Sequence, residues 1–180
     1  MKVLLIFCFM YLFAGSEKPE LSKEGSKKLN KLLSELYHNQ KLQIDRLNLA
    51  GENLTDNDIL NADGKWFAIS EAEKLVGWLM TDKAWGRYHE FEYAIVIDTN
   101  LFIKDVSVLS YPASHGNAVT NKSWLYGFNG FSPDNIPVYG REIDALSGAS
   151  ISGPHLSESI AKALLILKKL DEQALLKSQQ

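Results

Sequence analysis

Small residues and hydroxyl side chains are concentrated in the segment 142–153, which runs Glu-Ile-Asp-Ala-Leu-Ser-Gly-Ala-Ser-Ile-Ser-Gly just before a predicted helix. The first amides of a helix have no intrahelical acceptor, and the helix dipole places partial positive charge at the same end. Glycine and alanine let a ligand approach the backbone closely, so this segment could receive a phosphate group. Many helices begin with serine and glycine and bind nothing, so this pattern alone leaves both possibilities open.

The helix that must position this segment follows Gly153-Pro154. Its apolar residues recur at helical spacing, at Leu156, Ile160, Ala163, Leu164 and Leu167. We expect Ser152 to be the N-cap, and Pro154 suits the first turn. The last residues, 173–180, are expected to fray.

Four strand-like runs precede the segment, at residues 66–69, 75–80, 91–97 and 102–109. The third and fourth runs alternate apolar and polar residues, which predicts strands with one buried face. Short links join the runs, and this favours an antiparallel sheet. The second run could instead belong to a helix from Ser70 to Met80. A short helix is expected from about Thr120 to Phe128.

The N-terminal part predicts a helical arm. Residues 17–28 are polar and indicate a linker or a frayed helix start, and the apolar residues that follow share one helical face: Leu29, Leu32, Leu33, Leu36 and Tyr37. The helix is expected to end near Asn39 or to continue to about Leu49. Its apolar stripe would pack on the domain or meet a partner. The fold class is therefore α+β: an antiparallel sheet packed with a C-terminal helix, plus the N-terminal helical arm.

The first sixteen residues have the pattern of a secretory signal peptide. Lys2 is followed by an apolar run at 3–14, and Ala14-Gly15-Ser16 offers small residues for a cut after Ser16. A membrane span needs about 20 apolar residues, and this run is shorter. We therefore expect an exported protein, periplasmic or otherwise extracytoplasmic, and membrane-anchored only if the leader is not cleaved. Beyond this signal peptide (1–16), we divide the chain into a linker and helical arm (17–64) and one further domain (65–180).

The composition excludes several classes of function. The chain has 180 residues, 46 % of them hydrophobic and 23 % charged, which is typical of globular domains. Its net charge of −3 weighs against a nucleic-acid partner, which would favour excess Lys and Arg. The one cysteine, Cys8, lies in the leader. The four histidines lack metal-ligand spacing, so no metal site is expected.

The string Asp144-x-x-Ser147-Gly148-Ala149-Ser150 resembles the D-x-x-S-G-A-T flavinylation motif of FMN-binding domains. Such domains occur in the covalent-flavin subunits of the sodium-pumping quinone reductase and of the related ferredoxin-oxidising membrane complex, and in stand-alone exported electron-transfer proteins. The resemblance extends from about Trp66 to Leu167. Strand pairs come first, then His115-Gly116, Trp124-Leu125 and Phe128-Asn129-Gly130, and then the motif and a closing helix.

The resemblance implies FMN as the cofactor and a role for each matching residue. In the family, a dedicated flavin transferase uses FAD and magnesium to esterify the last hydroxyl of the motif to the phosphate of FMN, and Ser150 stands at that position. The phosphate oxygens would be bound by the Ser147 hydroxyl and by the amides of Gly148, Ala149, Ile151 and Ser152. Asp144 corresponds to the pattern that the transferase recognises, unless it is only a turn residue.

Two further pairs of residues are implied in flavin contact. Trp124 and Leu125 would cover the isoalloxazine ring, unless they belong to the core. His115 and Gly116 correspond loosely to the loop that faces the flavin, although the residues themselves favour His115 as a solvent-exposed loop residue over a proton donor. No catalytic residue is required, because the flavin supplies the chemistry. The implied partners are the flavin transferase and a membrane electron donor or other redox protein.

Ser150 departs from the family, which usually has threonine at this position. Serine keeps the hydroxyl but lacks the β-methyl group that restricts χ1. Covalent FMN, non-covalent FMN and no flavin therefore stay open, the last as a flavin-free binding or assembly module that retains the fold. A hydrolase built from Ser147 or Ser150 with His115 or His155 and Asp144 has little support, because no G-x-S-x-G elbow is present. Ser159-x-x-Lys162 matches S-x-x-K only within a predicted amphipathic helix.

Overall fold

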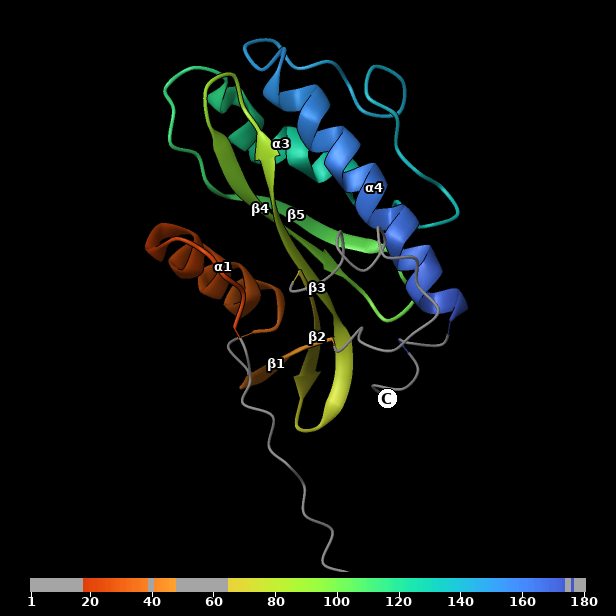
Figure 1. Ribbon diagram of the computed structural model, residues 1–180. Helices are drawn as coiled ribbons and strands as arrows, with labels where there is room; N and C mark the ends of the chain where they lie inside the picture. The colour runs from red at the N-terminus through yellow and green to blue at the C-terminus, as the bar shows by residue number, and fades with distance from the viewer. Residues whose placement is uncertain (1–17, 39–40, 48–64, 174–175, 177–180) are drawn as a thin grey trace, which may run out of the picture.

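Five strands form one antiparallel sheet in the order β1-β2-β3-β4-β5, with a helix on each side (Figure 1). The computed structural model describes residues 18–38, 41–47, 65–173 and 176, so the predicted leader lies outside the described residues. The elements are α1 (Lys23–Leu36), β1 (Leu42–Arg46), β2 (Trp66–Glu71), β3 (Lys74–Trp85), β4 (Glu90–Ile97), β5 (Ile103–Ser110), η1 (Asn117–Thr120), α3 (Lys122–Leu125), η2 (Tyr126–Phe128) and α4 (Ser152–Glu172). This arrangement confirms the predicted α+β class.

The sheet is covered on both faces by apolar side chains. On one face α4 contributes Leu156, Ile160, Leu164 and Leu167 to a core with residues of β3 and β4 such as Trp78 and Phe91. On the other face Leu29 and Leu33 of α1 pack with Leu79, Ala94 and Val96. The apolar stripe of the arm therefore packs on the sheet.

Strand β4 is buried on both faces, and the expectation of a half-buried strand was wrong. Every residue from Phe91 to Ile97 is buried. The residues assigned to a solvent-facing side include Ala94 and Val96, and α1 covers them. The alternation in the sequence therefore separates two apolar cores rather than a core from water.

The chain between α1 and β3 differs from the sequence prediction in three places. The helix ends at Leu36, so its extension to Leu49 was wrong, and the missed strand β1 follows at Leu42. The helix suggested for Ser70–Met80 was also wrong, because β2 and β3 form a hairpin. Ala72 and Glu73 make its two-residue turn with φ of 46° and 66°, the positive values that suit the twist of a hairpin.

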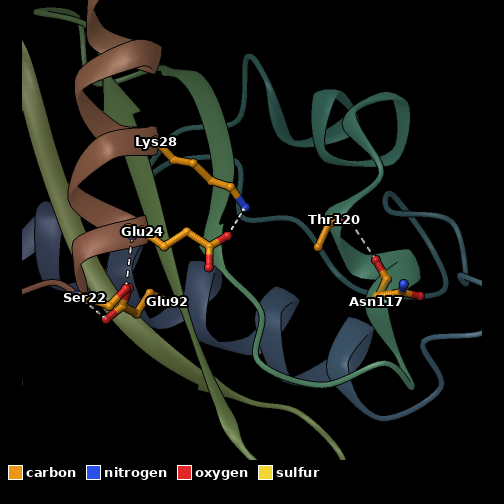
Figure 2. Close-up of polar contacts among 7 residues, drawn as sticks. Ser22, Glu24, Lys28, Glu92, Asn117 and Thr120 are labelled. Atoms are coloured by element: carbon orange, nitrogen blue, oxygen red, sulfur yellow. Dashed lines mark hydrogen bonds and ion pairs between the residues drawn. The ribbon is translucent and has the colours of Figure 1, made fainter.

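A carboxylate on the sheet holds the beginning of α1 (Figure 2). Glu92 of β4 accepts hydrogen bonds from the backbone N–H of Ser22 (2.8 Å) and from its hydroxyl (2.7 Å). The Ser22 hydroxyl oxygen in turn accepts from the N–H of Gly25 at 3.0 Å, as an N-cap does. A Cβ atom at Gly25 would collide with the Glu92 carboxylate. Glycine therefore lets the helix approach the sheet this closely without displacing the Glu92 carboxylate.

Candidate functional site

The motif segment meets two other segments that the sequence analysis singled out. The indole Nε1 of Trp124, in α3, donates to the carbonyl oxygen of Asp144 at 2.8 Å. The hydroxyl of Ser152 donates to the carbonyl oxygen of Gly116 at 3.0 Å. These two hydrogen bonds join residues that lie 20 and 36 positions apart in the chain. The fold brings His115-Gly116, Trp124 and the motif to one place.

The start of α4 differs in detail from the sequence prediction. Ile151 occupies the N-cap position and makes no side-chain capping bond. Ser152 was expected to be the N-cap, and this was wrong, since its buried hydroxyl bonds the loop at Gly116 instead. Pro154 lies in the first turn as expected, because its missing N–H would have no intrahelical acceptor there.

A tight turn carries the motif from Leu146 to Ala149. The N–H of Ala149 donates to the Leu146 carbonyl at 3.2 Å. Gly148 has φ of +80°, a conformation that strains residues with a Cβ atom. The N–H of Leu146 donates to the phenolic oxygen of Tyr139 at 2.9 Å, and the side chain of Ala149 is buried. The small residues of the motif are therefore required by the turn and by its close packing.

Several backbone amides close to Ser150 in the chain are unused. Ser147, Gly148 and Ser150 are exposed. Within the described part of the chain, the amides of Gly148, Ser150, Ile151 and Ser152 have no protein acceptor, whereas that of Ala149 is taken by Leu146. The positive end of the α4 dipole lies at the same point. Backbone amides without an acceptor at a helix start are the kind of donor that a phosphate group binds, and here the amide of Ala149 is already engaged.

The residues predicted to contact an isoalloxazine ring have different environments. Trp124 is half-buried and meets Phe128 edge to face, with ring centroids 5.3 Å apart. Leu125 is only 5 % exposed and belongs to the core beneath α4. His115 is exposed, and its Nδ1 lies 3.2 Å from the Ser114 hydroxyl oxygen. Asp144 is exposed, and its backbone carbonyl rather than its carboxylate accepts from Trp124.

Two tyrosines support the site and were missed in the sequence. The hydroxyl of Tyr111 donates to the His115 carbonyl at 2.9 Å, and its ring packs on Phe91 with centroids 5.1 Å apart. Tyr139 supports the motif turn, and a Cβ atom at Gly153 would lie 3.2 Å from its hydroxyl oxygen. Neither tyrosine falls in a recognisable motif, so the only available signal was an aromatic residue in a segment rich in Gly and Pro.

The side chains considered for a hydrolase are engaged elsewhere. His115 pairs with Ser114, and Nδ1 of His155 lies 3.0 Å from the carbonyl oxygen of Trp85. Lys162 forms an ion pair with Glu158 at 2.8 Å and lowers the pKa of that carboxyl by hydrogen bonding. Within the described residues no histidine therefore bonds Ser147 or Ser150, and the S-x-x-K string is an ordinary helix surface.

The described residues contain no group of three or more His, Cys, Asp or Glu side chains arranged to hold a metal ion. Among the same residues, no helix has both the length and the apolar character needed to cross a bilayer.

Comparison with known proteins shows which solved structure the fold resembles. No known family profile matches the sequence, and no curated protein matches it. Among solved structures, the chain is similar to the crystal structure of NqrC from Shewanella oneidensis, with a TM-score of 0.53 and 15 % sequence identity. The match covers 84 % of this chain and all of that one. The chain therefore has an NqrC-like α+β fold.

Proposed function

We propose that this chain is a flavoprotein that binds one FMN at Ser150 and transfers electrons outside the cytoplasm. One observation carries the proposal: an exposed Ser150 hydroxyl lies in the same short segment as unused amide donors at the start of α4, within the string that resembles the flavinylation motif. The NqrC-like fold supports a role in flavin binding and electron transfer. Bound FMN would supply the redox chemistry, and the protein would set its position and access.

Different residues of the site would bind the phosphate and the ring system of FMN. The amides of Gly148, Ile151 and Ser152 would donate to phosphate oxygens, and the exposed Ser147 hydroxyl is close enough in the chain to add another donor. Trp124 holds Asp144 and so fixes the other end of the motif. Trp124, Leu125, His115 and Gly116 remain our candidates for contacts with the ring system, Trp124 being the more accessible of the first pair.

Covalent attachment is the finer part of the proposal. The Ser150 oxygen would attack the phosphorus of the FMN half of FAD, and the bond to the AMP half would break. The hydroxyl proton and AMP leave together, so the protein gains the mass of one FMN less one water. A flavin transferase is the partner that this step requires, with Asp144 as part of its recognition site. The electron donor would be a membrane complex or another redox protein.

Co-expression with a flavin transferase tests the proposal. We expect in-gel flavin fluorescence that persists through denaturation, together with a mass increase of one FMN less one water. Ser150→Ala should abolish both, whereas Ser147→Ala, which removes a phosphate donor but not the attacking oxygen, should lower the attached fraction without abolishing it. Ser150→Thr restores the β-methyl group and should raise the attached fraction.

The other outcomes separate the alternatives. If the flavin colour is lost on denaturation, FMN is bound non-covalently and the proposed ester is wrong. A colourless protein under both conditions would contradict flavin binding and favour a flavin-free binding or assembly module.

A further inference from the structure

The outer side of β1 is an open edge of the sheet. The strand order runs from β1 to β5, so these two are the edge strands. The edge at β5 is partly covered, because the N–H of Ile103 donates to the carbonyl of Phe131 and its carbonyl accepts from the N–H of Gly130, both at 2.8 Å. No segment among the described residues pairs with the outer side of β1. An edge of this kind can receive a further strand.

The backbone of β1 leaves hydrogen-bonding groups on this outer side. The N–H of Leu47, just after the strand, donates to the carbonyl of Trp66 in β2 at 2.9 Å. Successive residues of an antiparallel strand direct their N–H and C=O groups to opposite sides, so those of Asp45 also face β2. Leu42 and Ile44 therefore direct their N–H and C=O groups away from β2, where a second strand could pair with both.

A groove of about 620 Å³ lies between α1 and this edge. Leu21, Leu42 and Ile44 line it, and all three are half-buried, so apolar surface is open along β1. Leu42 and Ile44 share the face of β1 that packs toward α1. A strand added at this edge would therefore place the apolar residues of its own corresponding face in the groove beside α1.

The charged residues of β1 and its flank determine which strand fits. Lys41 and Asp45 are exposed, carry opposite charges and lie two residues on either side of Gln43. Charges on an edge strand oppose its pairing with most other strands. In an antiparallel pair of two copies centred on Gln43, however, each Lys41 lies opposite Asp45 of the other copy. In the same pair Leu42 lies opposite Ile44, so the strand is complementary to itself.

The neighbouring registers are less complementary. A pair centred on Ile44 would place apolar Leu42 opposite charged Arg46. A pair centred on Asp45 would place two carboxylates opposite each other, and like charges directly opposite are destabilising. The register centred on Gln43 is therefore the one that the sequence of β1 favours.

We propose that β1 pairs with β1 of a second copy about a twofold axis through Gln43, so that two five-stranded sheets become one continuous sheet. Leu42 and Ile44 of each copy exchange backbone hydrogen bonds with Ile44 and Leu42 of the other. Their side chains fill the groove beside α1, and two Lys41–Asp45 pairs form on the opposite face. Figure 1 shows β1 at the end of the molecule away from the start of α4, so the pairing does not involve the proposed flavin site.

Sedimentation equilibrium of the full chain at concentrations up to about 500 µM tests this pairing. We expect a reversible equilibrium between monomer and dimer. Asp45→Lys should weaken the dimer at least about tenfold, because two like-charge pairs replace two pairs of opposite charge. Glu90→Lys is the matched control, since it reverses the charge of an exposed carboxylate on β4, and it should dimerise like the parent. Circular dichroism would verify that each variant folds.

Mixing two variants tests the register itself. Lys41→Asp alone should weaken the dimer as Asp45→Lys does. One copy of each variant together restores opposite charges at both positions, so the mixture should form a heterodimer about as tight as the parent dimer. The double variant Lys41→Asp/Asp45→Lys should recover self-association for the same reason. A parent that stays monomeric, equal dimerisation of Asp45→Lys and Glu90→Lys, or a mixture that stays monomeric would overturn the proposal.

Discussion

The indole nitrogen of Trp124 and the carbonyl oxygen of Asp144 lie 2.8 Å apart and form a hydrogen bond. The bond joins α3 to the first residue of the motif, although 20 positions separate the two residues in the chain. Ser152 makes the equivalent link at the other end of the motif, to Gly116. The motif turn is thus fixed at both ends by a hydrogen bond between a side chain and a backbone carbonyl.

Trp124→Phe should destabilise the protein through the loss of this bond. Phenylalanine keeps an aromatic ring against Phe128 but has no N–H donor, and a lost hydrogen bond typically costs about 1 kcal/mol. We expect the melting temperature to fall by about 2–4 °C. Trp85→Phe is the control, because Trp85 is 57 % exposed, and it should change the melting temperature little. Equal effects of the two substitutions would contradict the structural role of the bond.

Glu92→Gln should loosen α1 from the sheet. The carboxylate of Glu92 receives two hydrogen bonds from Ser22 and also faces the positive end of the α1 dipole. The amide keeps one acceptor oxygen and loses the charge, so we expect a loss of about 1–2 kcal/mol in the free energy of unfolding. Urea denaturation measures the loss, and hydrogen exchange should show faster exchange in α1.

Glu90 provides the control for Glu92. It lies two residues earlier on the same strand but is exposed, so Glu90→Gln should change stability by no more than about 0.5 kcal/mol. A similar loss in both variants would indicate a general effect of charge rather than anchoring of α1.

The course of the chain was largely predictable from its local patterns. The alternating residues of β4 and β5 and the helical spacing of α4 each identify their element. The short strand β1 (Leu42–Arg46) was missed because it alternates apolar and polar residues over four positions only, and the stretch was considered as a continuation of the preceding helix. The burial of both faces of β4 could not be read from the strand itself, because it depends on α1 packing over Ala94 and Val96.

The motif turn of the candidate site could be predicted from the sequence, but the residues that hold it in place could not. Small residues before a helix indicate a turn with accessible amides, and the structure has that turn at Gly148. The partners of Ser152, Asp144 and Leu146 are set by tertiary packing, and no local pattern names Gly116 or Tyr139 as their contacts. The N-cap assignment failed for the same reason, since the Ser152 hydroxyl has a better-placed acceptor in a distant loop.

Stability should fall at high pH because of Tyr37. Burial, reinforced by the charge of Asp98, raises the pKa of Tyr37 from 10.0 to about 12. Above pH 10 the unfolded chain loses this proton while the folded chain keeps it, so the unfolded state is favoured as the pH rises to about 12. Two pKa units correspond to a loss of about 2–3 kcal/mol in the free energy of unfolding across this range.

Tyr37→Phe removes this titration. Urea denaturation between pH 9 and pH 12 should show a flatter profile for this variant than for the parent. Tyr126→Phe, which changes a 72 % exposed side chain, should keep the parent's slope. A parent profile that does not fall above pH 10 would contradict the assignment to Tyr37.

Comparing Gly148→Ala with Gly130→Ala should separate two effects. Both variants introduce backbone strain at a positive φ, but only Gly148→Ala changes the motif turn. Gly148 and Gly130 have φ of +80° and +83°, and a Cβ atom would meet no close contact at either residue. Each alanine variant should therefore lose about 1 kcal/mol of stability from backbone strain. Only Gly148→Ala displaces the amides beside Ser150, so only it should lower the fraction of protein that carries flavin after co-expression with a transferase. Equal flavin content in the two variants would show that the conformation of the motif turn does not matter for loading.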